Sequence, residues 1–461
     1  MPTPEAPPQQ PTDTSSADGE RADAARRAEQ ILDRHLLTEG MMPLVLDVER
    51  SRGTTLIDQR TGEQYIDLFG FYASSPLGMN PPQLEGDDAF LERLHRAALN
   101  KVTNSDVRTP LLGRFVETFS RVGIPEYLPY AFFISGGALA VENALKAAFD
   151  WKVRKNFQQG YRREVGHQVL HLDQAFHGRT GYTLSLTDTP DPVKTKYFPK
   201  FDWPRITNPA LRFPVTEEEK ARVREHEAQA LQQAERYFHE REDEIAAVLL
   251  EPIQGEGGDN HFRPPFLKNL KALAHDHDAL LIFDEVQSGV GITGAFWAHQ
   301  ALGVRPDLLA FGKKSQVCGV LAGEKLGEVD DHVFEVPSRL NSTWGGNIVD
   351  MVRFDRILEV IEEDDLLGHA ADVGAHLLEE LQALASDYDA VTNPRGRGLM
   401  CAFDVPTPDT QARLKELCFD EGVILLGCGT RSIRFRPPLT ITRAELDDGL
   451  AALRRALDRI A

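Results

Sequence analysis

The sequence has few cysteines and no long apolar run. Four cysteines occur in 461 residues, and no two of them form a C-x-x-C pair. This pattern favours free buried thiols in a reducing compartment over a disulfide framework or a metal site. No apolar stretch approaches the roughly 20 residues of a membrane span. Residues 1–20 lack the apolar segment and basic start of a signal peptide, so we expect a cytoplasmic protein with no membrane partner.

Basic residues are also in short supply. The chain carries 51 Lys and Arg against 71 Asp and Glu, which gives a formal net charge of −20. This balance argues against a protein that binds nucleic acid by neutralising phosphates. The composition, 41% hydrophobic and 26% charged, is typical of a soluble globular protein, and the length allows two or three domains. Residues 1–20, rich in Pro, Gln, Ser and Thr, predict a disordered arm.

Short apolar runs alternate with helical segments through the middle of the chain. The runs YAFFI, HQVLHL, AAVLL, LLIF and LLAF are predicted strands, each followed by a glycine turn, loop or helix. Strands buried on both faces that alternate with helices are typical of a mostly parallel sheet in an α/β domain. A helix over 20–37 and a hairpin over 54–70, with Thr61-Gly62 at its turn, are predicted before them. The last hundred residues predict α+β structure.

One glycine pattern suggests a dinucleotide site. After the run LLIF, Gly289, Gly291 and Gly294 have the G-x-G-x-x-G spacing of a nucleotide-binding loop. Residues 284–288 separate strand and glycines, however. The acid about twenty residues further on, Asp307, stands before its strand rather than after it, at the wrong edge of the sheet for a ribose. These two features disfavour a nicotinamide or flavin enzyme.

The ends of two neighbouring strands carry a different combination. Asp284 ends LLIF, and Lys313 follows LLAFG, at the sheet edge where ligands bind in α/β folds. Pyridoxal phosphate (PLP) needs a lysine amine, a carboxylate beside its pyridine nitrogen and a phosphate cradle. SGGALAVENALK, residues 135–146, offers such a cradle at a helix N-terminus. Each feature alone has an ordinary explanation as a cap, a solvated lysine or a turn, but their joint presence favours PLP.

With these segments the sequence resembles the class III (ω-amino acid) aminotransferases of PLP fold type I. LLIFDEVQSGVGITG resembles the signature around the ring-nitrogen acid, and PDLLAFGK resembles the Schiff-base lysine segment. SGGALAVENALKAA resembles the phosphate loop, although Ser135 replaces the usual Asn and Leu139 the usual Glu. Longer phrases resemble the lysine-specific group of this family: ASSPLGMNPP, AFHGRTGYTLSLT, FPKFDWPRI, EPIQGEGGDNHFRP and PSRLNSTWGGN.

The resemblance implies an aspartate aminotransferase-like α/β fold. Its large domain would hold a mostly parallel seven-stranded sheet, beside a smaller α+β domain. Residues 96–346 would form the large PLP-binding domain, and residues 347–461 the C-terminal small domain. Residues 21–95 would contribute to the small domain. The family also implies a homodimer with shared active sites.

The resemblance further implies roles for cofactor-binding residues. Lys313 would be the Schiff-base lysine and proton-transfer base, and Asp284 would hold the protonated pyridine nitrogen. Gln287 would reach the ring hydroxyl oxygen and contact substrate, and Phe176 would stack on the ring. The remaining predicted cofactor ligands are Gly137 and Ala138, whose N–H groups would bind the phosphate, Ser342, and Thr343 of the partner subunit. No metal is expected.

Substrate chemistry predicts two arginines with different tasks. L-lysine reacting through its ε-nitrogen has a carboxylate only at its far end, whereas 2-oxoglutarate also has one beside the reacting carbon. Arg179 would bind the remote carboxylate and Arg434 the near one. Glu256 would pair with Arg434 when lysine binds, because an unpaired buried guanidinium is costly. Residues two apart in a strand point to the same side, so Arg436 could bind the near carboxylate instead of Arg434, and only the family pattern favours Arg434.

The predicted activity is therefore transfer of the ε-amino group of L-lysine to 2-oxoglutarate. The products would be glutamate and 2-aminoadipate 6-semialdehyde, which cyclises to piperideine-6-carboxylate. Two alternatives stay open: an ω-aminotransferase acting on ornithine or 4-aminobutyrate, and a catalytically silent PLP-fold binding protein. The Asp284–Lys313 combination argues against the second.

Overall fold

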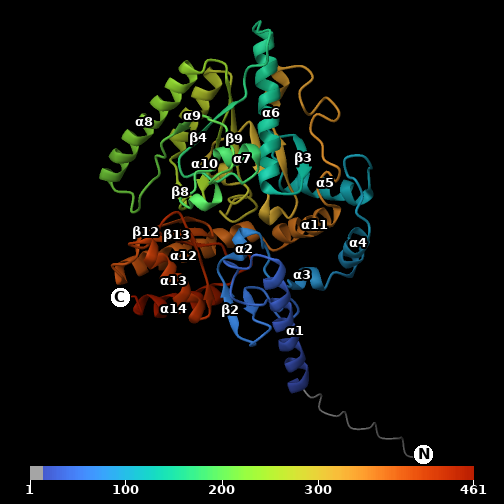
Figure 1. The fold of residues 1–461 in the computed structure, drawn as a ribbon, viewed down its shortest axis with the longest axis vertical. Helices are drawn as coiled ribbons and strands as arrows, with labels where there is room; N and C mark the ends of the chain where they lie inside the picture. The colour runs from blue at the N-terminus through green and yellow to red at the C-terminus, as the bar shows by residue number, and fades with distance from the viewer. Residues whose placement is uncertain (1–13, 461) are drawn as a thin grey trace, which may run out of the picture.

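The apolar runs of the middle of the chain form one seven-stranded sheet (Figure 1). The computed structural model describes residues 14–460. β11 is antiparallel to both of its neighbours, and the other strands run parallel to one another. In sheet order the strands are β3 (Tyr130–Ile134), β11 (Cys318–Ala322), β10 (Leu308–Phe311), β9 (Leu280–Asp284), β6 (Ile245–Leu250), β4 (Gln168–Leu172) and β5 (Arg205–Ile206).

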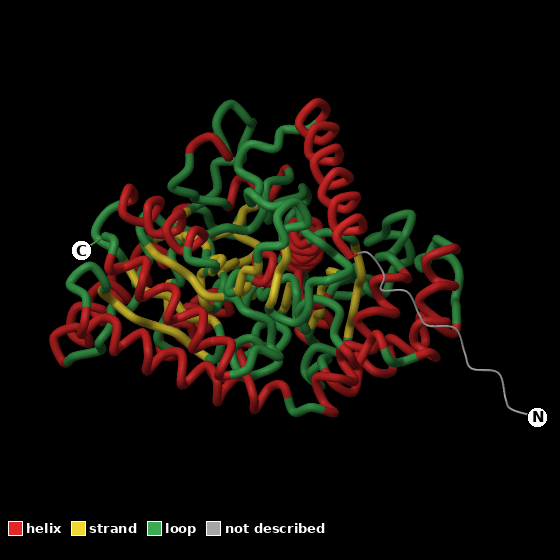
Figure 2. The backbone as a smooth tube through the Cα atoms, turned by 90° about the horizontal axis from the view of Figure 1, so that it is seen from below, coloured by secondary structure: helices red, strands yellow, loops and turns green. Residues whose placement is uncertain are grey.

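Helices cover both faces of this sheet, which explains the uninterrupted apolar strands. Within β9, Leu280 and Ile282 pack toward α6 (Gly137–Gln158), while Leu281 and Phe283 pack toward the opposite face. That second face is covered by α8 (Glu217–Glu240) and α9 (Pro264–Asp276). Strands thus lie inside a shell of helices (Figure 2). The fold prediction of an α/β protein with a mostly parallel seven-stranded sheet is confirmed.

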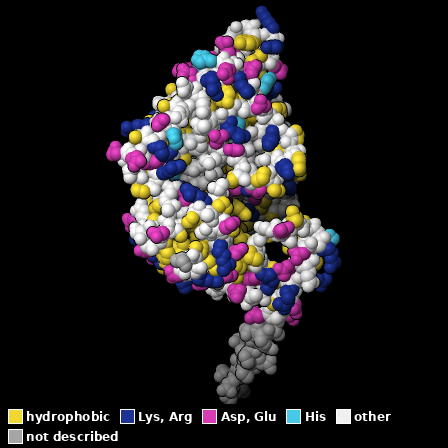
Figure 3. Space-filling view, turned by 60° about the vertical axis from the view of Figure 1, so that its left-hand side comes forward, with side chains coloured by type: hydrophobic (Ala, Val, Ile, Leu, Met, Phe, Trp, Pro, Cys, Tyr) yellow, Lys and Arg dark blue, Asp and Glu magenta, His cyan; other side chains and the backbone are white. Residues whose placement is uncertain are grey.

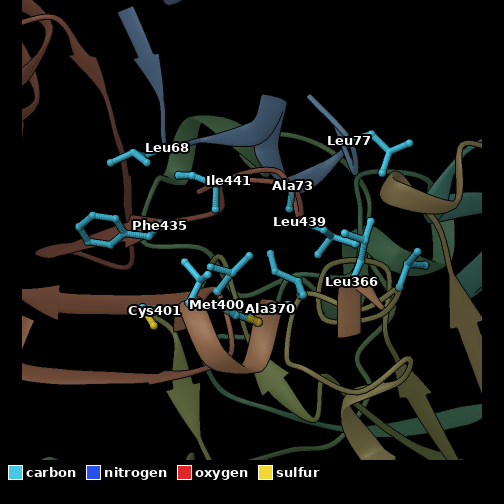
Figure 4. Close-up of a cluster of buried hydrophobic side chains, with 14 of the residues drawn as sticks. Leu68, Ala73, Leu77, Leu366, Ala370, Met400, Cys401, Phe435, Leu439 and Ile441 are labelled. Atoms are coloured by element: carbon cyan, nitrogen blue, oxygen red, sulfur yellow. The ribbon is translucent and has the colours of Figure 1, made fainter. Parts of the chain in front are cut away.

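A smaller α+β part follows in the chain. Its antiparallel sheet has the order β12 (Thr392–Arg397), β13 (Met400–Asp404), β16 (Ser432–Phe435) and β15 (Leu426–Cys428). The helices are α11 (Ile348–Glu363), α12 (Leu366–Asp387), α13 (Pro408–Asp420) and α14 (Arg443–Asp458). Figure 4 shows Met400 and Phe435 of this sheet in one apolar cluster with Ala370 of α12 and with Leu68 and Leu77 of the N-terminal segment.

The N-terminal segment joins the C-terminal part through a small sheet. β1 (Thr55–Ile57) and β2 (Gln64–Asp67) form the predicted hairpin, and β2 pairs in parallel with β14 (Val423–Ile424). The connecting helices then lead into the large sheet: α2 (Gly70–Ala73), α3 (Pro82–Glu85), α4 (Asp88–Leu99) and α5 (Pro110–Val122). Helix α11 packs along α4 and α5, so helices that lie before and after the predicted domain boundary at residue 346 form one layer. Short elements complete the chain: α7 (Gly181–Leu186), η1 (Pro192–Lys194), β7 (Ile253–Gln254), β8 (Asn260–His261), α10 (Ala298–Leu302), η2 (Lys313–Ser315) and η3 (Glu324–Glu328).

The prediction of a disordered arm over residues 1–20 is partly wrong. Helix α1 (Thr14–His35) begins before residue 20, and the rest of the predicted arm, residues 1–13, lies outside the described residues. Asp18 in this helix forms an ion pair with Arg50 at 3.2 Å. A composition poor in apolar residues therefore did not exclude a helix here. The helix predicted from residue 20 onward begins earlier, and the ion pair with Arg50 holds its first turns.

The surface carries both signs of charge despite the net charge of −20. On the face shown in Figure 3, acidic and basic side chains are interspersed. Among residues 14–460, no helix is both long and apolar enough to cross a membrane. Within the same range, no three His, Cys, Asp or Glu side chains gather as a candidate metal site.

Candidate active site

The structure brings Asp284 and Lys313 to the same edge of the large sheet. β9 and β10 are parallel neighbours, with Ala310 opposite Asp284, so the two strands end side by side. Lys313 follows β10 after Gly312 and has a left-handed backbone, with φ of 55°. This turn releases its side chain from the strand and presents it at the carboxyl edge, where the sequence predicted a ligand site.

The adjacent lysines differ in their surroundings. Lys313 Nζ donates to the carbonyl of Tyr72 at 3.0 Å. Burial and the charges of Arg434 and Arg436 lower the pKa of Lys313 to about 8, against the opposing effect of nearby acids. A lysine with such a pKa has a larger fraction of neutral, nucleophilic amine near neutral pH than an ordinary lysine. Lys314 is 2% exposed and donates to the carbonyls of Ala73 and Gln287, so it belongs to the framework.

Asp284 is held by a histidine that the sequence did not assign. Asp284 Oδ2 lies 2.8 Å from His177 Nδ1, and Asp284 Oδ1 accepts from the N–H of Val286 at 3.0 Å. Both Asp284 and His177 are buried. Because a carboxylate only accepts, the imidazole donates from Nδ1, and this contact fixes both its tautomer and the orientation of the acid. The pair is suited to hold a protonated ring nitrogen.

The start of α6 forms a pocket for an anion. Gly136, with φ of 108°, ends the preceding turn, and the N–H groups of Gly137 and Ala138 are the first of the helix. N–H groups at such a position lack intrahelical acceptors and lie at the positive end of the helix dipole. A Cβ on Gly137 would lie 2.9 Å from Val286, and one on Gly178 would lie 2.5 Å from the Ala138 methyl. Glycine is therefore needed where the site loops converge.

Glu251 ties two loops of the site together and was also missed. It follows β6 and is buried, with Oε1 accepting from the N–H of Phe176 at 3.0 Å and Oε2 from that of Gly255 at 2.9 Å. Burial raises the pKa of Glu251 to about 7, with His177 opposing and Asp284 adding to the shift. The half-buried Phe176 is thereby held beside the Asp284–His177 pair, as a ring-stacking residue would need to be.

Arg434 and Arg436 are separated by their partners. Arg436 is 1% exposed, and its two terminal nitrogens bind the two carboxylate oxygens of Asp259, which is fully buried. Its Nε donates to Gln287 Oε1 at 3.0 Å. These contacts occupy the guanidinium of Arg436. Arg434, also buried, instead pairs through Nη2 with Glu256 Oε2 at 3.0 Å, and its Nε has no partner among the described residues.

Glu256 lies between two cations rather than one. Its Oε1 accepts from Lys194 Nζ at 3.0 Å, while Oε2 faces Arg434. Burial alone would raise the pKa of Glu256, but the charges and hydrogen bonds of Arg434 and Lys194 lower it below its usual value. A quarter of its side chain is exposed, in contrast to the fully buried Asp259. Lys194, at the end of η1, was not among the predicted site residues.

The remaining predicted residues make no hydrogen bond or ion pair to these groups among residues 14–460. Arg179 is exposed and makes no ion pair with any described residue, which leaves its guanidinium available to a ligand. Ser342 and Thr343 contact another loop, where Ser105 Oγ donates to the Ser342 carbonyl at 2.6 Å. Within residues 14–460, no hydrogen bond connects Ser342 or Thr343 with Lys313, Asp284 or the start of α6.

The donor set fits PLP. A lysine with a lowered pKa and a buried carboxylate stand on adjacent strand ends, and a glycine-bounded helix N-terminus lies beside them. An aromatic side chain and a half-buried glutamine complete the surroundings of a planar ring. These are the contacts that an aldehyde, a pyridine nitrogen, a phosphate and an aromatic face require.

Comparison with known proteins agrees with this chemistry. The family model described as Aminotransferase class-III matches residues 37–457, so the chain belongs to the class III aminotransferases, which are PLP-dependent enzymes. It is 55% identical over 436 residues to the L-lysine-epsilon aminotransferase of Amycolatopsis lactamdurans, covering 94% of this chain and 96% of that protein. It is 32% identical over 419 residues to the mitochondrial 4-aminobutyrate aminotransferase of Homo sapiens, covering 85% and 80%.

A solved structure shows the same similarity in three dimensions. The lysine aminotransferase from M. tuberculosis in the internal aldimine form superposes with a TM-score of 0.92 at 53% sequence identity. The match covers 95% of this chain and 100% of that one.

Proposed function

We propose that this enzyme transfers the ε-amino group of L-lysine to 2-oxoglutarate. The products are glutamate and 2-aminoadipate 6-semialdehyde, which cyclises to piperideine-6-carboxylate. The observation that carries the proposal is the ion pair between Glu256 and Arg434 at 3.0 Å, beside an Arg436 that is fully engaged elsewhere. The identity of 55% to an L-lysine-epsilon aminotransferase, against 32% to a 4-aminobutyrate aminotransferase, supports lysine over other ω-amino substrates.

The two half-reactions need different charges at one place. Lysine brings a cationic ε-amine and no carboxylate to the reacting end, so the Glu256–Arg434 pair presents it with a neutralised guanidinium. 2-Oxoglutarate brings a carboxylate there, which binds Arg434 as a planar bidentate partner once Glu256 has moved away. Arg179 binds the remote carboxylate that both substrates share, and its lack of an ion partner among the described residues suits that task.

Bound PLP supplies the electron sink that stabilises negative charge at the reacting carbon. Lys313 would hold the cofactor through its amine and, once free, would move the proton at the reacting carbon, for which a pKa of about 8 suits it. Asp284, which His177 holds in place, would keep the pyridine nitrogen protonated. Phe176 would cover the ring face, Gln287 would reach the ring oxygen and the substrate, and the N–H groups at the start of α6 would bind the phosphate.

We further propose a homodimer whose active sites are shared, located in the cytoplasm. Large apolar side chains stand exposed next to site segments: Leu139 in the first turn of α6 at 38%, Trp344 beside Thr343 at 39% and Tyr72 at 52%. A second copy would cover them and bring Ser342 and Thr343 to the phosphate of its partner. The four cysteines are free and buried, as suits a reducing compartment. Native mass spectrometry tests the assembly, and a monomer would contradict it.

The direct test of the activity is a substrate panel. Purified holoenzyme is incubated with 2-oxoglutarate and lysine, ornithine or 4-aminobutyrate, and glutamate is measured together with the cyclised product. We expect lysine to give by far the highest kcat/KM. A higher kcat/KM for ornithine or 4-aminobutyrate would show that the substrate assignment is wrong. Absence of turnover with all three would favour a catalytically silent binding protein.

A further inference from the structure

The carboxylate of Glu256 has a second partner that the two-arginine scheme does not use. Lys194 lies at the end of η1 and donates to Glu256 Oε1 at 3.0 Å. Arg434 binds the other oxygen at the same distance. Each cation therefore contacts its own oxygen, and loss of the contact to Arg434 does not by itself break the contact to Lys194.

A carboxylate that leaves Arg434 needs a partner where it arrives. Three quarters of the Glu256 side chain is withdrawn from solvent, and a carboxylate in such surroundings is costly to leave unpaired. The other cations nearby are engaged. Arg436 is bound by Asp259 and Gln287, and Arg395 is bound by Asp404 and by the carbonyls of residues 258 and 259. Lys313 donates to the carbonyl of Tyr72.

Lys194 is placed to follow the movement of Glu256. Its side chain is 23% exposed, and it belongs to a surface segment in which Val193 and Tyr197 are 79% and 89% exposed. A flexible ammonium that donates in several directions can keep its contact while the carboxylate turns, which a planar guanidinium fixed in a sheet cannot do. Arg434, within β16, stays in place to receive the incoming carboxylate.

We propose that Lys194 is a positioning residue that holds Glu256 away from Arg434 during the 2-oxoglutarate half-reaction. This inference rests on the proposed function and extends it. The Glu256 carboxylate contacts both Arg434 and Lys194 during the half-reaction with substrate lysine, and Lys194 alone during the half-reaction with 2-oxoglutarate. Lys194 thereby sets how readily Arg434 becomes available to a carboxylate. It acts through Glu256 and does not touch the substrate.

The test uses unreactive ligands that differ by one carboxylate. Glutarate resembles 2-oxoglutarate without the keto group and needs both Arg179 and an uncovered Arg434, whereas pentanoate has the same length and one carboxylate. Dissociation constants for both are measured on holoenzyme by titration calorimetry, for wild type, Lys194→Met and Lys194→Arg. Lys196→Met is the matched control, since Lys196 lies in the same segment with its Nζ over the exposed ring of Tyr197.

We expect Lys194→Met to weaken glutarate binding roughly tenfold, the usual scale for a hydrogen bond between charged groups, and to leave pentanoate binding unchanged. Lys194→Arg should restore most of the loss, and Lys196→Met should resemble wild type. Tighter glutarate binding in Lys194→Met would overturn the proposal, because Lys194 would then hold Glu256 on Arg434. An equal loss for both ligands would also overturn it and indicate a merely structural role.

A double-mutant cycle separates positioning from direct binding. In a Glu256→Ala background, Arg434 is permanently uncovered, and Lys194→Met should no longer affect glutarate. If Lys194→Met still weakens glutarate there, Lys194 binds the ligand itself and the proposal is wrong. The lysine and 2-oxoglutarate assay on wild type stays independent of this outcome: failure of the cycle removes the role of Lys194 alone, while failure of the assay removes the substrate assignment.

Discussion

The active site and the buried framework next to it contain the same kinds of charged side chain, but these side chains have different partners in the two regions. Lys313 and Lys314 are adjacent, yet Lys313 lies at the sheet edge with a pKa lowered to about 8, while Lys314 is buried against backbone carbonyls. Arg434 lies in β16 and Arg436 directly after its end, yet Asp259 binds both terminal nitrogens of Arg436, whereas one oxygen of Glu256 binds Arg434.

Two adjacent acids divide in the same way. Asp284 faces the site beside His177. Glu285, fully buried, accepts from the N–H groups of Ala298 and His299 at 2.6 and 2.9 Å and so caps the start of α10. In each pair the framework member makes its hydrogen bonds to fixed groups of the protein, whereas the site member keeps capacity for a ligand. Residual capacity, and not charge or burial, distinguishes the functional residue.

The lysine pair should give the largest contrast. Lys313→Ala removes both the bond to the cofactor and the proton carrier, so turnover should fall by about 10⁴-fold or more. Lys314→Met should keep the cofactor bond and lose stability of roughly 1–3 kcal/mol, because two buried carbonyls lose a donor. Borohydride reduction followed by peptide mapping checks this, and cofactor attached at Lys314 would reverse the assignment.

The next contrast concerns the acids that face the two arginines. Asp259→Asn leaves Arg436 buried without a counter-charge and should lower the free energy of unfolding by about 3–5 kcal/mol. Glu256→Gln should cost less, roughly 1–3 kcal/mol, since a quarter of the Glu256 side chain is exposed and the amide oxygen of glutamine can still accept from Arg434 or Lys194. Urea titrations measure both. Similar losses in the two variants would show that Glu256 belongs to the framework.

Substitutions of the adjacent acids Asp284 and Glu285 should affect different properties, turnover in the first case and stability in the second. Asp284→Asn keeps shape but removes the charge that holds the ring nitrogen protonated, so turnover should drop about 10²–10³-fold while PLP still binds. Glu285→Gln should instead mainly lower the melting temperature. Near-normal turnover in Asp284→Asn, measured with cofactor content by absorbance, would contradict the role of this acid.

The smallest expected effect distinguishes the half-reactions. Glu256→Ala should lower kcat/KM for lysine and preserve or raise it for glutamate, changing their ratio roughly tenfold, in single-turnover measurements. Arg434→Ala should give the opposite ratio, and Arg179→Ala should impair both half-reactions. Equal slowing of lysine and glutamate by Glu256→Ala would refute the switch.

Local sequence pattern was enough for the central strands and for the residues at their ends. β6, β9 and β10 are apolar throughout because both faces are covered, and Asp284 and Lys313 follow from where those strands stop. β11 was not anticipated: it follows Lys313 so closely that no turn signal separates it, and it runs antiparallel. The glycines after β9 serve packing, since a Cβ on Gly291 or Gly294 would meet Leu439 or Ala371 rather than a nucleotide.

The missed site residues have a different cause. His177, Glu251 and Lys194 reach the site from segments far from Asp284 and Glu256 in the chain, and nothing in their local sequence states which acid or N–H group they will meet. Glu251 left one signal, an acid directly after a buried strand. Strand alternation cannot separate Arg434 from Arg436, and what separates them is the position of Asp259.

The backbone of Lys313 has a consequence for how this protein can change over generations. A left-handed conformation costs a non-glycine residue about 1–2 kcal/mol, and glycine pays none of it. Lysine is thus thermodynamically the poorer occupant of position 313, and Lys313→Gly should raise stability relative to Lys313→Ala. If transamination were no longer needed, glycine at position 313 would give a more stable fold. Lysine is therefore retained only while selection for catalysis outweighs selection for stability.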